Sequence, residues 1–318
     1  MKAIRIHEFG GAEKLRLEEI EKPQPKPDEV LIKNAAAGIN YADIMLRNGR
    51  YLRQPPLPVT PGFEAAGTVE AVGASVTDWK VGQRVLALID AGGYAEYVST
   101  NVSQLVSIPD RLEFGHATAL LVQGLTAVAL LRDLQAGQTI LIHAAAGGVG
   151  SLLVQLAKYK GAKVIGTASS TEKLQKVIEL GADIGINYAE SGWANQVLQA
   201  TANKGADLII EMAGGEIGRQ NLNCLATHGT MIVYGAASGE DFQISALSLL
   251  AKMQTVKGYY LTIDSPSNRA LYSKELMEHI HAGRLRVMVT EFPIEQAMKA
   301  HRAIESRRTT GKVVLSIN

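Results

Sequence analysis

In the first 110 or so residues, hydrophobic and polar positions alternate over short stretches that turn-forming residues interrupt. Alternation with a period of two is the pattern of a half-buried β-strand, and clusters of Pro, Gly and Asp mark the turns. Strands this short and this frequent predict an antiparallel barrel or sandwich. The expected strands are Lys2–His7, Leu15–Ile20, Glu29–Ala36, Ala65–Val72, Arg84–Leu88, Tyr94–Ser99 and Leu105–Ile108.

From Thr139 onward the pattern changes to apolar strands that alternate with amphipathic helices. Strand and helix in alternation predict an α/β fold with a doubly wound parallel sheet. Thr171 is the expected N-cap of one helix, because its hydroxyl can accept a hydrogen bond from a backbone N–H of the first turn. The expected strands are Thr139–His143, Lys163–Thr167, Ile184–Asn187, Ala206–Glu211 and Thr230–Tyr234, and the expected helices are Gly148–Lys160, Thr171–Leu180, Trp193–Ala202 and Glu216–Ala226.

The last part of the chain has helical patterns at Arg269–His281 and around Ile294–Ser306, followed by a strand at Lys312–Ile317. We expect this part to rejoin the β-rich domain. The predicted organisation is therefore a first part at residues 1–120, an inserted dinucleotide-binding domain at 121–262, and a return to the first domain at 263–318.

The composition narrows the possible partners and compartment. A net charge of +1 provides no broad basic surface, so neither nucleic acid nor an anionic membrane is expected to bind. The single cysteine, Cys224, rules out a disulfide within the chain and a thiolate-rich zinc site. No stretch approaches the roughly 18 apolar residues of a membrane span, and the alternating start predicts a strand and not a signal peptide. We expect a cytoplasmic protein.

The segment Ile140–Gly150 carries the strongest signal for a ligand. An apolar strand runs into small residues and then into a helix, with Ala145, Gly147 and Gly150 at the three positions of a G-x-G-x-x-G pattern. Glycines in this context make a tight turn and let the backbone and the helix N-terminus approach a pyrophosphate. The competing interpretation is a tight turn that binds nothing.

The end of the next strand favours NADPH over NADH. An NAD site carries an Asp or Glu near this position to accept a hydrogen bond from the ribose 2′-hydroxyl. Here Ser169, Ser170 and Lys173 stand instead, and these side chains can bind a 2′-phosphate. The alternative for Lys173 is a solvated lysine in the first turn of a helix.

These motifs resemble those of the NADPH:quinone oxidoreductases, a zinc-independent branch of the medium-chain dehydrogenase/reductase superfamily. The resemblance covers essentially the whole chain and implies a Rossmann domain inserted in a GroES-like catalytic domain. It rests on Gly38–Asp43, Pro61–Gly67, Gly82–Val85, Gln123–Ala127, Ala144–Gly150, Gln155–Lys158, Gly161–Gly166, Gly181–Asp183 and Ile186–Tyr188.

The resemblance also implies roles for individual residues. Asn40 and Thr126 would lie near the nicotinamide, Lys173 would meet the 2′-phosphate, and Tyr188 would lie against the adenosine half. Arg307 would close on the cofactor from the far end. The pyrophosphate would lie on Ala145, Gly147, Gly148, Val149 and Gly150, and the nicotinamide ribose would pass Gly235, Ala236 and Ala237.

No metal is expected. Zinc alcohol dehydrogenases of the superfamily have a cysteine where this chain has Asn40 and a histidine where it has Phe63, and catalytic zinc needs three protein ligands. The four-cysteine lobe of structural zinc is also missing near Leu88–Gly93. Without a Lewis acid, the expected chemistry is hydride transfer from NADPH to an acceptor that is already electron-poor.

The polar candidates near the reacting atoms are Asn40, Tyr41, Asp43, Arg47 and Tyr51, and for Asp43 a structural hydrogen bond or ion pair is the favoured interpretation. Asn40, Tyr41 and Tyr51 are the candidate catalytic residues, and Asn40 or Tyr51 can hydrogen-bond an acceptor oxygen as negative charge develops. For Tyr51 the alternative is packing against the Pro55-Pro56 loop. Met45 stands where several quinone oxidoreductases have a tyrosine, so the acceptor pocket differs from theirs.

Three functions remain open at this point: reduction of quinones, reduction of a carbon–carbon double bond conjugated to a carbonyl, and cofactor binding with little catalysis. The resemblance further implies a homodimer that forms through a sheet edge of the cofactor domain.

Overall fold

The computed structural model describes residues 1–317, which divide into two compact units. Among these residues, unit 1 comprises 1–122 and 287–317, and unit 2 comprises 123–286. The second unit is thus inserted in the sequence of the first. The return to unit 1 follows Arg286 and not residue 262, because the segment 263–286, including helix α9 (Pro266–His281), is part of unit 2, where α9 contacts helix α3 (Thr126–Leu130). The expected boundary was wrong here because an amphipathic pattern shows that a helix has a buried face but not which domain buries it.

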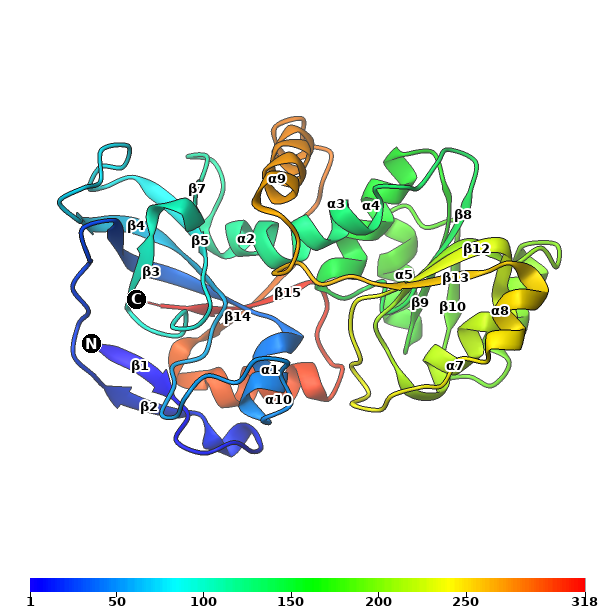
Figure 1. Cartoon of the computed structure of the whole chain (residues 1–318), viewed down its shortest axis with the longest axis horizontal. Helices are drawn as coiled ribbons and strands as arrows, with labels where there is room; N and C mark the ends of the chain where they lie inside the picture. Colours follow the sequence, from blue (N-terminus) through cyan, green and yellow to red (C-terminus); the bar gives the residue numbers. More distant parts are fainter. Residues whose placement is uncertain (318) are drawn as a thin grey trace. The chain divides into compact units, whose positions relative to one another are not determined.

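Unit 1 is built on a largely antiparallel sheet in the order β14-β15-β3-β4-β5-β7, with β6 also paired to β3 and with β14 parallel to β15 (Figure 1). A separate antiparallel pair joins β1 and β2. The strands are β1 (Lys2–Arg5), β2 (Arg16–Glu19), β3 (Glu29–Ile39), β4 (Glu64–Val72), β5 (Arg84–Leu88), β6 (Tyr97–Asn101), β7 (Leu105–Ser107), β14 (Val289–Pro293) and β15 (Lys312–Ser316), and the helices are α1 (Tyr41–Arg47), α2 (Phe114–Thr118) and α10 (Ala297–Glu305).

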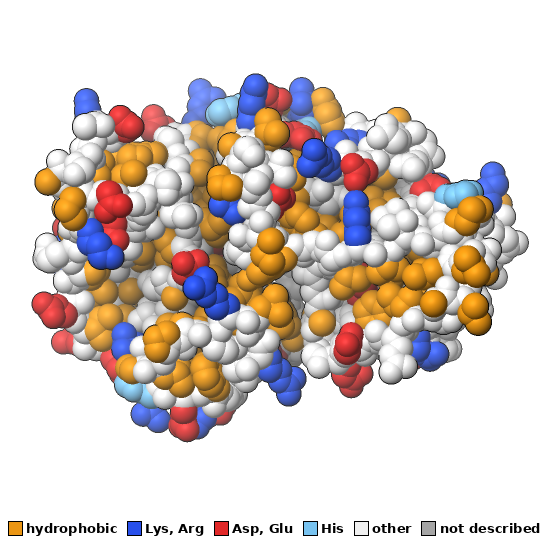
Figure 2. All heavy atoms as spheres, in the orientation of Figure 1, with side chains coloured by type: hydrophobic (Ala, Val, Ile, Leu, Met, Phe, Trp, Pro, Cys, Tyr) orange, Lys and Arg blue, Asp and Glu red, His pale blue; other side chains and the backbone are white. Residues whose placement is uncertain are grey.

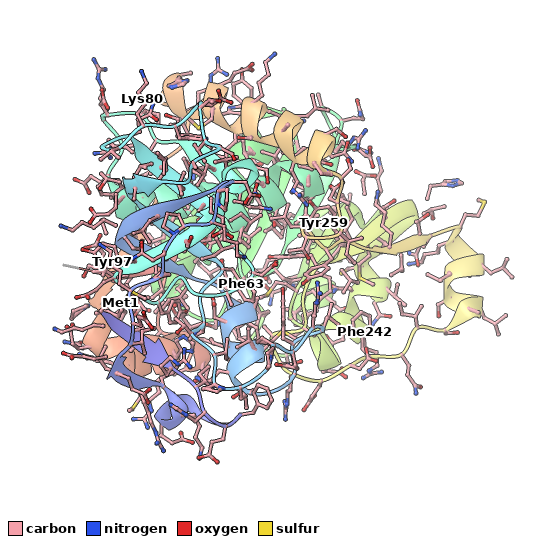
Figure 3. The ribbon with its side chains drawn as sticks, turned by 60° about the vertical axis from the view of Figure 1, so that its left-hand side comes forward. Met1, Phe63, Lys80, Tyr97, Phe242 and Tyr259 are labelled. Atoms are coloured by element: carbon pink, nitrogen blue, oxygen red, sulfur yellow. The ribbon has the colours of Figure 1, made fainter. Side chains whose placement is uncertain are left out.

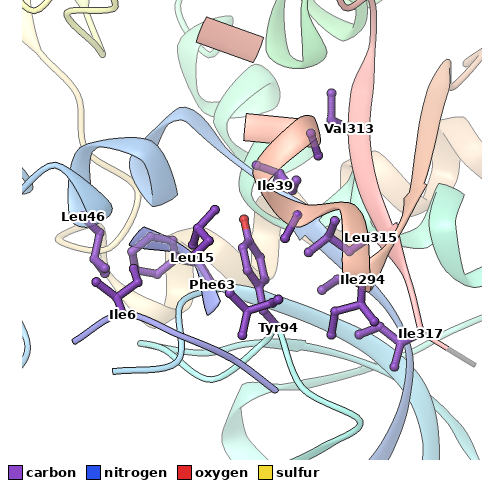
Figure 4. Close-up of a cluster of buried hydrophobic side chains, with 14 of the residues drawn as sticks. Ile6, Leu15, Ile39, Leu46, Phe63, Tyr94, Ile294, Val313, Leu315 and Ile317 are labelled. Atoms are coloured by element: carbon purple, nitrogen blue, oxygen red, sulfur yellow. The ribbon is translucent and has the colours of Figure 1, made fainter. Parts of the chain in front are cut away.

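The core of unit 1 joins its two sequence segments. Side chains from both segments form one buried cluster, in which Phe63 and Tyr94 lie beside residues of β3, β15 and the segment before α10 (Figure 4). Phe63 is 7% exposed and Tyr94 fully buried. This long-range burial is the reason that the last 30 or so residues return to the first domain. The labelled members are Ile6, Leu15, Ile39, Leu46, Phe63, Tyr94, Ile294, Val313, Leu315 and Ile317.

Unit 2 contains a parallel sheet in the order β10-β9-β8-β11-β12-β13, with helices between the strands (Figure 1). This is the doubly wound arrangement that alternating strands and helices predict. The strands are β8 (Thr139–Ile142), β9 (Lys163–Ala168), β10 (Ile184–Asn187), β11 (Ala206–Glu211), β12 (Leu225–Val233) and β13 (Thr255–Gly258), and the further helices are α4 (Gly148–Tyr159), α5 (Thr171–Glu179), α6 (Trp193–Ala200), α7 (Gly215–Cys224) and α8 (Ala246–Lys252).

Small residues allow the helices of unit 2 to pack closely. A Cβ at Gly166 of β9 would lie within 3.0 Å of Val177 on α5, and a Cβ at Gly218 of α7 would collide with the ring of Phe242. Phe242 follows β12 and packs beside α7 (Figure 3).

The single cysteine, Cys224 at the end of α7, is buried, and burial raises the pKa of its thiol to about 12, as expected for an inert side chain. Among residues 1–317, no helix combines the length and apolarity needed to span a bilayer.

Candidate active site

The turn between β8 and α4 brings a row of backbone N–H groups to the start of the helix. Ala144 has a φ of 48°, and the amide of Gly147 donates to its carbonyl at 2.8 Å. Gly147 is the N-cap of α4, and Gly148 and Val149 follow in its first turn, where N–H groups have no partner within the helix. These amides and the helix dipole favour an anion at this position.

At two glycines of this turn an added Cβ would collide with other atoms of the protein. A Cβ at Gly150 would lie within 3.0 Å of the Ala144 carbonyl oxygen and of Ala145 Cα, which are both backbone atoms. A Cβ at Gly148 would overlap the carboxamide of Gln123. At Gly147, in contrast, the nearest atom within the protein is the Ala144 oxygen at 3.1 Å. The turn is therefore packed against backbone at Gly150, and Gly147 is its least crowded glycine.

The segment after β9 leads directly into helix α5. Its N-cap is Ser170, whose hydroxyl accepts from the amide of Lys173 at 3.4 Å, so the expectation of Thr171 as the cap was wrong by one residue. Both residues carry a hydroxyl, and only the backbone conformation decides between them: Ser170 is extended and Thr171 is the first helical residue. Ser169, Ser170 and Lys173 are half-buried at this end of the strand.

The other expected cofactor contacts of unit 2 follow neighbouring strands at the same edge of the sheet. Tyr188 comes after β10, and its amide donates to the Ala168 carbonyl of β9 at 3.2 Å. Gly235–Ala237 come after β12, and the amide of Ala237 donates to Met212, which follows β11, at 2.8 Å. Because carboxyl ends of parallel strands share one edge, the sheet brings these segments and the glycine turn together. Thr126 is buried in α3, a helix that contacts α4.

A network of buried polar side chains connects the ends of the strands at this edge of the sheet. The carboxylate of Glu211 accepts from the amides of Ala213 and Gly214 at 2.5 and 2.6 Å and from the side chain of Asn221. The ring of His143 contacts Asn221 Oδ1 at 2.7 Å and Thr167 Oγ1 at 2.9 Å, and burial lowers the pKa of the imidazole. These side chains tie together the ends of β8, β9 and β11.

In unit 1, Asn40 lies at the N-terminus of α1 and is 6% exposed. Its Nδ2 donates to Glu64 Oε2 at 2.8 Å, and Lys312 Nζ donates to its Oδ1 at 2.9 Å. Its backbone amide donates to Asp43 Oδ2 at 2.8 Å. Asp43 is fully buried, and burial raises the pKa of its carboxyl to about 7, although the Asn40 amide and the Lys312 charge oppose the shift.

A second set of buried polar side chains continues from α1 to α10. Arg47 Nη1 contacts His301 Nδ1 at 3.2 Å, and His301 Nε2 contacts the Tyr94 hydroxyl at 3.1 Å. Since a guanidinium can only donate, Nδ1 of His301 accepts and Nε2 carries the hydrogen. Burial lowers the pKa of His301 to about 3, so the ring stays neutral. Arg47 also forms an ion pair with Glu305 at 2.5 Å.

The remaining candidates lie on or near α1. Tyr41 opens the helix and is half-buried, and burial raises the pKa of its hydroxyl while the charge of Arg307 lowers it. The ring of Tyr51 packs against Phe63 with centroids 5.1 Å apart, at the edge of the hydrophobic cluster of unit 1. Arg307 is exposed, with a left-handed φ of 54°, in the loop between α10 and β15. A non-glycine residue held in this region often marks a functional loop.

Comparison with known proteins agrees with these features. The family model described as alcohol dehydrogenase GroES-like domain matches residues 26–110, and the one described as zinc-binding dehydrogenase matches residues 148–276. The chain is 36% identical to the quinone oxidoreductase of Pseudomonas aeruginosa, and the match covers 99% of each chain. The chain belongs to the quinone oxidoreductase family.

Solved structures of quinone oxidoreductases match over the full length. The enzyme of Pseudomonas syringae pv. Tomato DC3000 has a TM-score of 0.94 at 36% identity, with 99% of each chain covered. The Escherichia coli enzyme, solved in complex with NADPH, has a TM-score of 0.94 at 32% identity, with 99% of this chain and 100% of that chain covered. The predicted fold class, a Rossmann sheet together with a GroES-like domain, is confirmed.

One of the matching family models is described as a zinc-binding dehydrogenase. In this member of the quinone oxidoreductase family, however, the two positions that hold zinc ligands in the alcohol dehydrogenases carry Asn40 and Phe63. Phe63 is part of the hydrophobic core, and the carboxamide of Asn40 is bound by Glu64 and Lys312. Within residues 1–317, no three side chains of His, Cys, Asp or Glu are grouped so that they could hold a metal ion.

Sequence reasoning did not identify the polar partners that surround these candidates. Glu64 and Lys312 are 248 positions apart, and Tyr94 and His301 are 207 apart. Glu211 and Asn221 likewise gain their roles only from the packing of α7 on the sheet. A local motif cannot reveal such pairs, and the one available signal was the presence of charged residues within otherwise apolar strands.

The raised pKa of Asp43 predicts a pH-dependent contribution to stability in this quinone oxidoreductase family member. Between its ordinary pKa of 3.8 and about 7, the folded state holds a proton that the unfolded state has released. The free energy of unfolding therefore falls as the pH rises through this window. Chemical denaturation at pH 5 and pH 8 measures this decrease in the free energy of unfolding. The decrease is expected to be about 2 kcal/mol smaller in Asp43→Asn than in the natural chain.

The charged or titratable groups that face Asp43 are Glu64, Lys312 and Tyr94, and the variant leaves all three in place. Asp183→Asn, at a partly exposed carboxyl in unit 2 whose pKa is lowered, is the matched control and should not flatten the profile in this direction. An Asp43→Asn profile parallel to that of the natural chain would contradict the assignment.

Proposed function

We propose that this protein catalyses the reduction of quinones by NADPH, with transfer of a hydride and without a metal. NADPH and a proton together reduce the quinone to a hydroquinone and leave NADP⁺. The observation that carries the proposal is the full-length match to quinone oxidoreductases, including the NADPH complex of the Escherichia coli enzyme.

The glycine turn and the residues that follow β9 are compatible with bound NADPH. The glycine turn is closed to a side chain by backbone atoms at Gly150, whereas at Gly147 an added Cβ would meet only one protein atom, as suits a backbone cradle for a pyrophosphate. Hydroxyl and ammonium groups replace the acidic residue of an NAD site. We assign the pyrophosphate to Ala145, Gly147, Gly148, Val149 and Gly150, the 2′-phosphate to Ser169, Ser170 and Lys173, the adenosine to Tyr188, and the nicotinamide half to Asn40, Thr126, Gly235, Ala236, Ala237 and Arg307.

When bound, NADPH supplies the hydride, and the protein contributes orientation and hydrogen bonds. We assign Asn40, Tyr41 and Tyr51 to the acceptor side. Each can donate to the acceptor oxygen, where negative charge develops as the hydride arrives. Because Asn40 is already held by two charged partners, its carboxamide is pre-organised for such a contact.

We further propose that the reaction is zinc-independent. Asparagine and phenylalanine replace two of the ligands that catalytic zinc requires, and the ammonium of Lys312 already binds the Asn40 oxygen. Elemental analysis that found stoichiometric zinc, lost together with activity, would overturn this part of the proposal.

The function is tested by following NADPH oxidation at 340 nm with a panel of quinones and a panel of α,β-unsaturated ketones and aldehydes. Turnover with quinones at higher kcat/KM than with the unsaturated carbonyls supports the proposal. Higher kcat/KM with the unsaturated carbonyls would assign the chain to double-bond reduction. Tight NADPH binding with no turnover on either panel would leave a cofactor-binding role.

Replacement of Tyr51 by phenylalanine is expected to lower kcat about tenfold and leave the Kd for NADPH unchanged, since one hydrogen bond to the developing charge is lost. The ring stays in contact with Phe63, so the fold should be kept. Steady-state kinetics and a fluorescence titration measure the two quantities. Tyr97→Phe, on the exposed side of β6, is the control. An unchanged kcat would remove Tyr51 from the site.

We propose that the protein forms a homodimer through the β13 edge of unit 2. Within residues 1–317, β13 pairs with β12 alone, so its other edge presents unpaired backbone groups. Hydrophobic side chains gather over the α8–β13 end of the unit (Figure 2), where Leu247, Leu250 and Met253 are 75%, 74% and 61% exposed. A second copy would cover both features, because a symmetric interface buries the same patch on both subunits.

Sedimentation velocity is expected to give a dimer, and Leu250→Asp is expected to give a monomer that keeps its folded circular dichroism spectrum. Leu17→Asp, at an exposed leucine of β2, should remain dimeric. A monomeric natural chain at micromolar concentration would contradict the proposal.

The single, buried Cys224 fits a reducing compartment, and we propose on this ground that the protein is cytoplasmic.

A further inference from the structure

Two side chains of opposite charge are completely buried beside Asn40. Glu64 is the first residue of β4 and Lys312 the first residue of β15, and the side chains of both are 0% exposed. Lys312 Nζ is in contact with Glu64 Oε2. Strand β3 pairs with both of these strands, so the sheet itself brings the two residues together.

The pair determines which way the Asn40 carboxamide points. An ammonium can only donate hydrogen bonds and a carboxylate can only accept them. The Asn40 oxygen must therefore face Lys312, at 2.9 Å, and the Asn40 nitrogen must face Glu64, at 2.8 Å. The backbone of Asn40 is fixed separately through Asp43.

The fold makes room for this arrangement. A Cβ at Gly38 of β3 would lie within 3.0 Å of both Glu64 Oε2 and the Lys312 side chain, so only glycine fits beside the pair. The other carboxylate oxygen of Glu64 accepts from the amide of Val122 at 2.7 Å, in the π-helical segment Leu120–Leu125 that leads from unit 1 into unit 2 along the chain. Both oxygens of Glu64 are thus satisfied within unit 1.

Stability alone is a weak reason for such a pair. Two charges lose their hydration when they are buried, and replacing both with apolar groups of similar size is often neutral or stabilising. What apolar side chains cannot do is impose a direction on a neighbouring carboxamide.

We propose that Glu64 and Lys312 are positioning residues that orient the Asn40 carboxamide for the hydride-transfer step. This inference rests on the proposed function, in which Asn40 contacts the nicotinamide or the acceptor. Neither charged residue is proposed to touch a ligand. Their effect on the rate passes through Asn40.

The test uses the double variant E64Q/K312M in the full-length protein, because Lys312→Met alone would leave an unpaired buried carboxylate. We expect kcat to fall about 10- to 100-fold, the Kd for NADPH to change less than about twofold, and the isotope effect from NADPH deuterated at C4 to increase. In an N40A background the same pair of changes should have no further effect on kcat, since their action requires the carboxamide.

The matched control is E70Q/K22M, an exposed ion pair that also includes a residue of β4. This control is expected to leave all three quantities unchanged. A natural level of kcat in E64Q/K312M, or an equal loss in the natural and N40A backgrounds, would overturn the proposal.

A readout without turnover separates this inference from the proposed function. The ¹⁵N–¹H signals of the Asn40 carboxamide, identified by their absence in N40A, should shift or broaden in E64Q/K312M and stay in place in the control. Unmoved signals would refute the positioning role even if quinones are reduced. Absence of NADPH turnover in the natural chain would refute the proposed function instead.

Discussion

Replacing Gly150 with alanine is expected to weaken NADPH binding at least about 100-fold and to lower the thermal unfolding midpoint. The added methyl group would lie within 3.0 Å of two backbone atoms of the glycine turn, so the turn has to move away from its present conformation. The N–H groups at the start of α4 would then no longer converge on one phosphate. A fluorescence titration with NADPH measures the Kd, and differential scanning fluorimetry measures the midpoint.

Two further glycine variants separate the binding effect from the folding effect. At Gly147 a methyl group would lie 3.1 Å from one backbone oxygen, a tight contact that a shift of a few tenths of an ångström relieves, and it would occupy the space assigned to the pyrophosphate. Gly147→Ala should therefore lose binding and lower the unfolding midpoint less than Gly150→Ala does. At Gly258 of β13 the nearest atom is 4.0 Å away, and alanine should change neither quantity. If Gly150→Ala bound NADPH as tightly as the natural chain, this turn would not be the pyrophosphate site.

Removing the Lys173 side chain is expected to raise the KM for NADPH by about 10- to 100-fold and to leave the KM for NADH nearly unchanged. The 2′-phosphate carries most of two negative charges, and a charge-assisted hydrogen bond to it exists only for NADPH. Lys173 is in the first turn of α5, beside the cap residue Ser170, where the helix dipole also favours an anion. Steady-state kinetics of Lys173→Ala with both coenzymes measure the effect.

Lys176→Ala is the control for this variant, because it removes the same charge from the last turn of the same helix. An equal loss with NADPH and NADH would show that Lys173 does not recognise the additional phosphate. A natural chain that turns over NADH as well as NADPH at matched concentrations would contradict the coenzyme assignment itself.

The parts of the fold that the sequence predicted well are those in which neighbouring residues decide the outcome. The strand, turn and helix at 139–159 could be predicted because glycine is required where Gly150 meets the backbone of Ala144. The parallel sheet followed from the alternation of strands and helices. At α5 the same local reasoning missed the cap by one residue, because Ser170 and Thr171 offer the same hydroxyl.

The sequence by itself determined most of the strands and helices, the family motifs and the glycine turn, because each depends on the conformational preferences of residues close together in the chain. It did not predict helices α1, α2 and α8 or strands β13 and β14. Only the tertiary structure decided that α9 packs within unit 2, that Glu64 and Lys312 meet beside Asn40, and that His301 reaches Tyr94. The physical reason is burial. A charged or polar side chain inside a protein needs a partner, and that partner can come from any part of the chain that the fold brings near.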